Sequence, residues 1–218
     1  MIFETIQRLM SVGDIPEPTP PDPFPLLVRW LDDARNSNHY ADPNAMALAT
    51  ATPDGVPSVR IVLCKAIDLP EHSLKFFTNY ESRKGSELSA NPRAAVVFHW
   101  PHAGRQARVE GAIERLPEAE SDEYFKSRPL ISRIGAIVSH QSAVIRSRAD
   151  LLAEAARVAG TSLVEAKLER PAYWGGFRLR ASSVELWCNC EGRLHQRVRW
   201  RRATLAEPAA WTSELLSP

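Results

Sequence analysis

The side chains best suited to chemistry in this chain are cations, and they gather in short clusters. The clearest cluster is Arg193-Leu-His-Gln-Arg197, and the same alternation continues through Arg199 and Arg201. In a strand, residues two apart share one face, so Arg193, His195 and Arg197 would project together. Arginine binds phosphate and carboxylate through a planar fork of donors, and histidine changes charge near neutral pH. The pattern predicts either an anion-binding strand or a solvated basic edge strand.

Two more basic clusters lie in the first half of the chain. Arg60 and Lys65 are five residues apart, so in a regular strand they would face opposite sides. Either they serve two ligands, or a bulge lies between them, or one of them is simply at the surface. Arg83 and Lys84 stand at the start of a predicted helix, where an anion would meet backbone N–H groups. That position is either an anion site or a surface turn.

A fourth cluster combines hydroxyl groups with a cation. Tyr124 and Arg128 are four apart and would share a helix face, and Ser132 follows shortly after. This set suits a phosphate, although a helix-face pair followed by a cap gives the same spacing. Trp187 ends an apolar strand and either stacks on a ring or fills the core. Because no nucleophile–base motif accompanies these anion sites, the sequence favours a reaction performed by a cofactor.

Composition narrows the class of protein. The 218 residues carry a formal net charge of +1 and are 44% hydrophobic, which favours a globular chain without a field that attracts nucleic acid or membrane. Three cysteines, Cys64, Cys188 and Cys190, argue against a disulfide framework and offer no four-ligand metal site. No signal peptide and no apolar run of about 20 residues is present, so a cytoplasmic location is expected.

The elements that must position these clusters follow from periodicity and turn signals. The proline-rich residues 1–21 are predicted to form an extended arm, and residues 22–218 a single domain. The predicted helices are 23–36, 82–90, 117–127 and most of 131–158, and the predicted strands are 45–52, 56–67, 74–78, 94–100, 106–116, 176–187, 197–204 and 214–216, with a loop at 160–172. Many strands with few intervening helices predict a mainly β fold with helices, an antiparallel barrel decorated by them.

In this order, the clusters resemble the pyridoxine/pyridoxamine 5′-phosphate oxidase family. The matching strings are Asp42-Pro-Asn-Ala-Met-Ala-Leu-Ala-Thr50, Arg60-Ile-Val-Leu-Cys-Lys65, Phe76-Phe-Thr-Asn79, Ser82-Arg-Lys84, Arg105-Gln106, Tyr124-Phe-Lys-Ser-Arg-Pro129, Ser132-Arg-Ile-Gly-Ala136, Ser139-His-Gln-Ser142, Trp174-Gly-Gly-Phe177, and Trp187 with Arg193-Leu-His195. The resemblance spans roughly residues 22–204 and implies a split β-barrel. It also implies a homodimer that binds FMN in the cleft between its subunits.

The resemblance implies roles for particular residues. The FMN site would comprise Arg60, Ile61, Val62, Leu63, Lys65, Phe77, Thr78, Arg83, Lys84, Gln106, Gln141, Ser142, Trp187 and Arg197. The substrate would contact Lys65, Tyr124, Arg128, Ser132, Arg193 and His195, and the catalytic residues would be Arg193, His195 and Arg197. The implied reaction oxidises pyridoxine or pyridoxamine 5′-phosphate to pyridoxal 5′-phosphate, with FMN as hydride acceptor and O2 reduced to H2O2.

Three departures from the family pattern concern the substrate side and the chain end. Gln196 stands where the family usually has aspartate, and Glu214 stands where a basic residue is common. Ile2 and Thr5 fall near the positions of an arginine-and-tyrosine lid. These departures keep two alternatives open. One is a related flavin oxidase that acts on another ring, as in phenazine pathways, and the other is a non-catalytic flavin or pyridoxal-phosphate binding protein.

Overall fold

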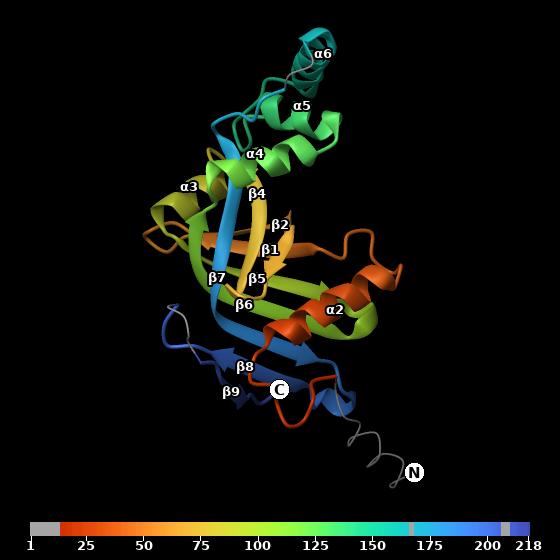
Figure 1. Cartoon of the computed structure of the whole chain (residues 1–218), viewed down its shortest axis with the longest axis vertical. Helices are drawn as coiled ribbons and strands as arrows, with labels where there is room; N and C mark the ends of the chain where they lie inside the picture. The colour runs from red at the N-terminus through yellow and green to blue at the C-terminus, as the bar shows by residue number, and fades with distance from the viewer. Residues whose placement is uncertain (1–13, 166–167, 206–209) are drawn as a thin grey trace.

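The computed structural model describes residues 14–165, 168–205 and 210–218. In this part of the chain, one antiparallel sheet of nine strands runs in the order β2-β1-β5-β6-β7-β4-β3, and β8 and β9 extend it from β7 (Figure 1). The strands are β1 (Ala45–Ala51), β2 (Pro57–Leu63), β3 (Ala66–Asp68), β4 (Ser73–Asn79), β5 (Arg93–Trp100), β6 (Arg105–Arg115), β7 (Trp174–Cys188), β8 (Gln196–Arg201) and β9 (Thr212–Leu215).

The long strand β7 gives the sheet its curl. Its first half pairs with β4 on one side, its second half pairs with β8, and β6 accompanies it along nearly its whole length. The register of β6 and β7 shifts between Glu110 and Gly111, which is a bulge that bends the strand. A Cβ at Gly111 would lie 1.9 Å from the carbonyl oxygen of Arg180, so only glycine fits this close approach. The sheet therefore curls into a half-barrel.

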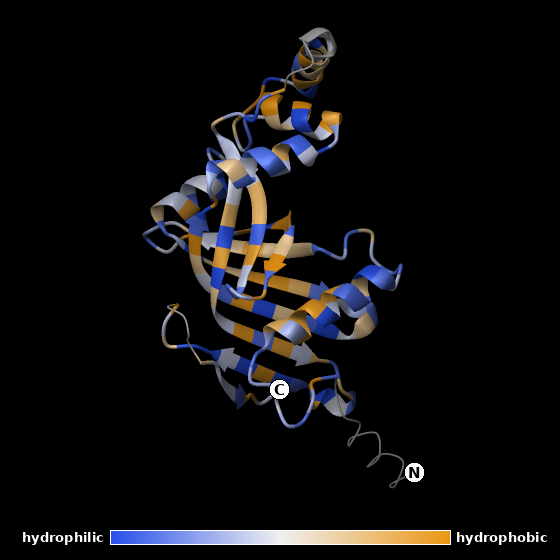
Figure 2. Cartoon of the chain, viewed as in Figure 1, coloured by the Kyte–Doolittle hydropathy of each residue, from blue (hydrophilic) through white to orange (hydrophobic). Residues whose placement is uncertain are grey.

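The core lies under helix α2 (Phe24–Asn36), which runs across the sheet (Figure 1). The buried residues of α2 include Leu26, Leu27, Trp30, Leu31 and Ala34, whose spacing places them on one face of the helix. Hydrophobic and hydrophilic residues alternate along the strands, which places one face of each strand against this core (Figure 2). Pro23 is the N-cap residue, and the side chain of Asp22 before it accepts a hydrogen bond of 2.9 Å from the N–H of Phe24, the first residue of the helix.

The remaining helices lie toward one end of the sheet (Figure 1). They are α3 (Arg83–Ala90), α4 (Glu118–Ser127), α5 (Leu130–Val138) and α6 (Arg148–Glu165). Ser82 is the N-cap residue of α3, and its side chain accepts a hydrogen bond from the N–H of Gly85. Two short 3-10 turns, Pro101–Ala103 and Glu191–Arg193, complete the regular structure.

Several sequence-based predictions need correction. The predicted strand 56–67 is interrupted at Cys64 and Lys65, because the Lys65 N–H bonds to the Lys75 carbonyl and turns the chain into β3. The predicted helical region 131–158 is two helices separated by residues 139–147, and α6 extends to Glu165, so the loop predicted from 160 begins later. Of the predicted arm, residues 14–21 form no helix or strand, and residues 1–13, which include Ile2 and Thr5, lie outside the described residues.

The prediction that Arg193 and His195 share a strand face with Arg197 is wrong. Strand β8 begins at Gln196, and Arg193 ends a 3-10 turn with a left-handed φ of 61°. The alternative prediction of a basic edge strand is also wrong, because β8 lies between β7 and β9. Its arginines have acidic partners: Arg197 bonds to Glu185 at 2.8 Å, and Arg199 pairs with Glu214 at 2.7 Å. Glu214, a departure from the family pattern, thus balances charge on this strand.

Candidate functional site

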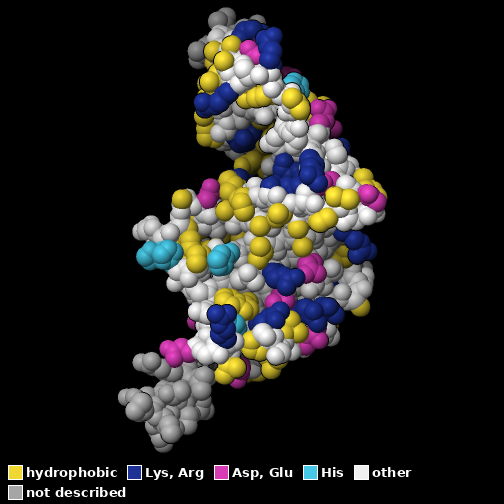
Figure 3. Space-filling view, turned by 180° about the vertical axis from the view of Figure 1, so that it is seen from behind, with side chains coloured by type: hydrophobic (Ala, Val, Ile, Leu, Met, Phe, Trp, Pro, Cys, Tyr) yellow, Lys and Arg dark blue, Asp and Glu magenta, His cyan; other side chains and the backbone are white. Residues whose placement is uncertain are grey.

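A cavity of about 440 Å³ lies between the β2–β4 side of the sheet and helices α4 and α5. It unites most of the cationic clusters predicted from the sequence. Twelve predicted site residues line it: Arg60, Ile61, Val62, Leu63, Lys65, Phe77, Thr78, Lys84, Tyr124, Arg128, Ser132 and Gln141. Seen from the side opposite to Figure 1, a hollow separates the helical end from the sheet, with Lys and Arg side chains at its edge (Figure 3).

One end of this cavity is built around a buried lysine. Lys84 is only 9% exposed, and its ammonium group donates to the side-chain oxygen of Gln141 at 2.6 Å and to Ser82 at 3.1 Å. Thr78 donates to the same Gln141 oxygen at 3.3 Å. Burial, and then the nearby charge of Arg60, lower the pKa of Lys84 to about 8. An anion bound at this point would raise the pKa of Lys84 again, because it stabilises the charged form.

Helix α3 and the segment after α5 meet beside Lys84. The N–H of Arg83, in the first turn of α3, donates to the hydroxyl of Ser142 at 3.2 Å. Ser142 holds a left-handed φ of 73°, a conformation that is uncommon for serine and recurs at functional sites. Arg83 and Ser142 line a depression next to the cavity, and Gln141 borders both. The sequence predicted all three as site residues, and the structure brings them together.

The opposite wall of the cavity is aromatic and carries a second cation. Phe77 stacks on Tyr124 with ring centroids 3.9 Å apart, and on Trp174 with centroids 5.7 Å apart. The guanidinium of Arg128 lies 4.6 Å from the centroid of Trp174. Its Nη1 is buried and has no hydrogen-bond partner among the described residues, and burial lowers the pKa of Arg128. A flat apolar wall beside an unsatisfied guanidinium suits a ring that bears an anionic group.

Arg60 and Lys65 both reach this cavity although they are five residues apart. Strand β2 ends at Leu63, so the two side chains do not follow a single strand's alternation. The sequence left a bulge between Arg60 and Lys65 as one alternative. The structure has a break between two strands at Cys64 and Lys65 instead. It also places the exposed Lys65 on the same side as Arg60.

The other predicted site residues form a second cluster on strands β6, β7 and β8. Gln106 is directly opposite Trp187, and Trp187 is directly opposite Arg197, so their side chains share one face. The ring of His195 lies 4.6 Å from the ring of Trp187. None of these side chains lines the cavity of the same chain. The predicted site is therefore divided into the cavity and this strand cluster.

The loop before β8 fixes the proton arrangement of His195. The N–H of Cys190 donates to His195 Nδ1 at 3.3 Å, so the neutral imidazole carries its proton on Nε2. Arg193, exposed in the preceding turn, has a left-handed backbone. Together, His195 and Arg193 can offer hydrogen-bond donors to a ligand that reaches this loop.

Gln196, a departure from the family pattern, bonds to the backbone of the segment that precedes α2. Its side-chain amide donates to the carbonyl of Ile15 at 2.9 Å and accepts from the N–H of Ile15 at 3.1 Å. Asp14 next to it pairs with Arg105 at 2.7 Å, and Trp200 donates to the carbonyl of Pro20 at 2.8 Å. Gln196 thus clamps the segment 14–21 to the start of β8.

Trp174 and Glu87 contribute to the site and were not assigned to it from the sequence. Trp174 lies in a string typical of the family but was not assigned to the site, although it forms part of the aromatic wall. Glu87 contacts both Arg60 and Arg83. The spacing of Arg83 and Glu87, four apart on a helix, was a usable signal for their pair. The contact with Arg60 depends on the tertiary fold and left no local signal.

The curled antiparallel sheet and the cation-rich, aromatic-walled cavity define a split β-barrel protein suited to phosphorylated, ring-bearing ligands. A family model described as pyridoxamine 5′-phosphate oxidase matches residues 35–162, and one described as the pyridoxine 5′-phosphate oxidase C-terminal dimerisation region matches residues 174–218. A relative from Salinibacter ruber, named pyridoxine/pyridoxamine 5′-phosphate oxidase, is 47% identical over 198 residues, which are 90% of this chain and 89% of the relative. The chain belongs to the pyridoxamine 5′-phosphate oxidase family.

Two further comparisons come from one organism. A Burkholderia lata (strain 383) protein named pyridoxine/pyridoxamine 5′-phosphate oxidase is 48% identical over 197 residues, which are 90% of this chain and 89% of that protein. The crystal structure of PhzG from Burkholderia lata 383, in complex with tetrahydrophenazine-1-carboxylic acid, has a TM-score of 0.86 and 31% identity. That comparison covers 97% of this chain and 100% of PhzG.

Membrane spans and metal sites can also be considered for the described residues. No helix there is both long and apolar enough to cross a membrane. Across the same residues, no three His, Cys, Asp or Glu side chains gather where they could hold a metal ion.

Proposed function

We propose that this protein is an FMN-dependent oxidase that converts pyridoxine or pyridoxamine 5′-phosphate to pyridoxal 5′-phosphate, with O2 reduced to H2O2. The observation that carries the proposal is the cavity itself. It joins two separate cationic groups, one around Lys84 and one around Arg128, across an aromatic wall. Two phosphate-bearing ring compounds, a flavin nucleotide and a pyridine 5′-phosphate, match this arrangement in charge and shape.

The donor set beside Lys84 fits the phosphate of FMN. Lys84 and Arg83 supply charge, and Ser142 and Gln141 supply neutral polar groups next to the start of helix α3. Of the remaining cavity residues, Arg60 adds a cation, and Ile61, Val62 and Leu63 supply a strand backbone and apolar contacts. Bound FMN would supply the hydride acceptor of the oxidation, which O2 then reoxidises.

The donor set beside Arg128 fits the phosphate of the substrate. The unsatisfied Nη1 of Arg128 is a donor without an acceptor in the described structure. Tyr124, Ser132 and Lys65 line the same cavity and add two hydroxyls and a second cation. A phosphate here would satisfy the guanidinium while the pyridine ring lies along the aromatic wall. Binding energy from the phosphate thereby orients the C4′ carbon for oxidation.

The strand cluster of Gln106, Trp187, His195 and Arg197 completes the proposed site from a second subunit. In a single chain this cluster does not line the cavity, and it lies largely within the segment that matches the family's dimerisation region. A homodimer with FMN at the subunit interface would bring the partner's cluster over the cavity. In that assembly, Arg193 and His195 would donate to the substrate ring, and Arg197 would contact FMN.

A related oxidase activity on a phenazine-type ring is the second candidate function. The overall similarity to PhzG, with a TM-score of 0.86, favours it. Two observations favour the vitamin B6 substrates instead. Within the same strain of Burkholderia lata, identity is 48% to the protein named pyridoxine/pyridoxamine 5′-phosphate oxidase and 31% to PhzG. In addition, the buried Nη1 of the half-buried Arg128, which has no hydrogen-bond partner among the described residues, suits a phosphate.

The visible spectrum of the FMN-saturated protein tests the proposal. Anaerobic addition of pyridoxine 5′-phosphate should bleach the flavin, and a pyridoxal phosphate band should appear. Admission of O2 should restore the flavin spectrum with production of H2O2. A flavin that stays oxidised with pyridoxine and pyridoxamine 5′-phosphate but bleaches with a dihydrophenazine would favour the second candidate. A flavin that no substrate bleaches would favour a binding protein, and absence of FMN binding would refute all three.

A further inference from the structure

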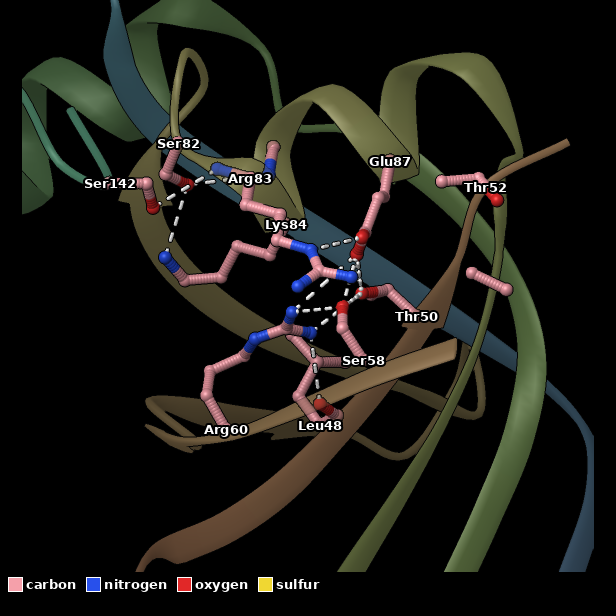
Figure 4. A network of polar contacts seen from close by, with 12 residues as sticks. Leu48, Thr50, Thr52, Ser58, Arg60, Ser82, Arg83, Lys84, Glu87 and Ser142 are labelled. Carbon is pink, nitrogen blue, oxygen red and sulfur yellow. Dashed lines mark hydrogen bonds and ion pairs between the residues drawn. The ribbon is translucent and has the colours of Figure 1, made fainter. Parts of the chain in front are cut away.

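A buried carboxylate lies behind the cationic end of the cavity. Glu87, on α3, has a side chain only 4% exposed. It accepts hydrogen bonds from the hydroxyls of Thr50 and Ser58, which stand directly opposite each other on β1 and β2 (Figure 4). Arg83 Nε donates to one of its oxygens at 2.8 Å, and Arg60 Nη2 lies 3.5 Å from the other.

This carboxylate stays ionised despite its burial. Desolvation opposes the charged form, but hydrogen bonds from Ser58, Thr50 and Arg83 outweigh it and lower the pKa of Glu87 to about 2. A buried charge with several partners is costly to leave unpaired, so its neighbours are constrained in position. The partners come from β1, β2 and α3, and Glu87 therefore ties a helix to two strands through one group.

The Glu87 carboxylate contacts Arg60 and Arg83 in different ways. Arg60 is fixed on several sides, because its guanidinium also donates to Ser58 at 2.5 Å, to Thr50 at 2.6 Å and to the Leu48 carbonyl at 3.1 Å. Arg83 is 57% exposed, and the described residues give its two terminal nitrogens no hydrogen-bond partner. Glu87 thus holds Arg83 by its Nε and leaves the two terminal nitrogens of the guanidinium available to a ligand.

Electrostatics gives Glu87 a second effect. Arg60 and Lys84 line one end of the cavity, and Arg83 lines the depression beside it, so three cations lie close together. The charge of Arg60 already contributes to the lowered pKa of Lys84. Without an anion nearby, these cations would repel one another and move apart. The Glu87 carboxylate offsets part of that repulsion before any ligand arrives. It does so from behind the two arginines.

We infer that Glu87 is a positioning residue that aligns Arg60 and Arg83 as a fixed pair for the phosphate of a flavin nucleotide. The inference rests on the proposed function, because it takes that phosphate as the ligand of this cluster. A purely structural role, in which Glu87 only joins α3 to the strands, is the competing explanation. The two differ in whether the effect depends on the ligand's phosphate.

Binding of FMN and of riboflavin to the full-length apoprotein distinguishes these roles. Riboflavin has the same ring system but no phosphate, so flavin fluorescence can measure both affinities under one condition. Glu87→Gln keeps the length of the side chain and removes its charge, and Glu87→Asp keeps the charge and shortens its reach. Both should weaken FMN binding about tenfold, the size of a lost charge-assisted contact, and leave riboflavin binding unchanged.

Two further variants keep the test decisive if Glu87 variants fold poorly. Ser58→Ala removes one donor but retains the buried carboxylate, and it should weaken FMN binding by a smaller factor with riboflavin again unaffected. Glu154→Gln removes a carboxylate from an exposed ion pair with Arg157 on α6 and should change neither affinity. Equal loss of FMN and riboflavin binding, or unchanged FMN binding, would overturn the inference. Failure of the wild-type protein to bind FMN would instead refute the proposed function.

Discussion

At the scale of single residues, the cavity is unusual in the cations that it buries. Lys84 and Arg128 both have a pKa lowered mainly by burial, and neither has a carboxylate partner among the described residues. The cations of β8 differ, because Glu185 and Glu214 compensate them. Cations that are buried without an acidic partner favour the binding of an anionic ligand, whereas paired cations mainly stabilise the fold.

If Lys84 binds the phosphate of FMN as proposed, FMN binding should depend on pH. Its pKa of about 8 means that the ammonium form dominates below pH 8, and this is the form that attracts a phosphate. Binding of the phosphate raises the pKa of Lys84, so above pH 8 the apoprotein must take up a proton to bind. The affinity for FMN should therefore fall as pH rises above 8, by up to about tenfold per pH unit.

Titration of the apoprotein with FMN at successive pH values measures this effect. Lys84→Met should bind FMN more weakly below pH 8 and should lack the decline above it. Riboflavin binding should show no such decline in either protein. A wild-type affinity for FMN that is constant from pH 7 to about pH 9.5, on either side of the pKa, would contradict the role of Lys84.

At the scale of elements, the segment 14–21 is held to β8 by specific contacts. The amide of Gln196 pairs with both backbone groups of Ile15, as a neighbouring strand would, and the side chain of Ile15 is fully buried. An aspartate at this position could only accept a hydrogen bond, since an ionised carboxylate has no donor. The glutamine therefore serves the contact between the segment and β8, beside His195 and Arg197.

Loss of the Gln196 amide should loosen this segment. Gln196→Ala removes two partly buried hydrogen bonds and should lower the free energy of unfolding by about 1–3 kcal/mol. Gln196→Asp should fall near the same value, because the donor is lost and the side chain is shorter. Chemical denaturation measures the stability, and hydrogen exchange at the Ile15 amide reports the local opening. Ser213→Ala, on exposed β9, is the control, and equal protection of Ile15 in Gln196→Ala would refute the clamp.

At the scale of the whole molecule, the proposed site is divided between two regions of one chain. The cavity is lined by residues of β2, β4, α4 and α5, whereas the strand cluster lies on β6, β7 and β8. Figure 1 shows where these elements lie. Exposed apolar side chains on β2, Val59 at 68% and Ile61 at 65%, are consistent with a surface that another subunit covers. Assembly of a homodimer would thus complete the chemistry as well as cover this surface.

Mixed dimers test whether the site is shared. Arg128→Ala should inactivate the cavity, and Arg193→Ala should inactivate the strand cluster, so each homodimer should show little turnover. In a heterodimer of the two, one site carries both changes and the other carries neither. Equal co-expression should therefore restore about a quarter of the wild-type activity, as expected for random pairing of two subunit types. Activity no higher than that of the single variants would show that both clusters act within one chain.

Much of the fold could be predicted from local sequence. Helix α2 follows from the spacing of its apolar residues, and α3 follows from the cap at Ser82. Twelve of the cavity residues were predicted as site residues through the ordered strings that resemble the family. The break between β2 and β3 was not predicted, because a hydrogen bond from Lys65 to Lys75 decides it and the local run of apolar residues does not.

The sequence by itself determined which residue types carry the chemistry, where most strands and helices lie, and which family the chain resembles. Only the tertiary structure decided which of those residues meet. Gln196 bonds to a residue 181 positions away, and Glu87 joins residues from β1, β2 and α3. Periodicity and capping are set by neighbours within a few residues, whereas these contacts depend on how the sheet curls. A buried charge or amide takes its partner from whatever the folded chain brings within hydrogen-bond distance.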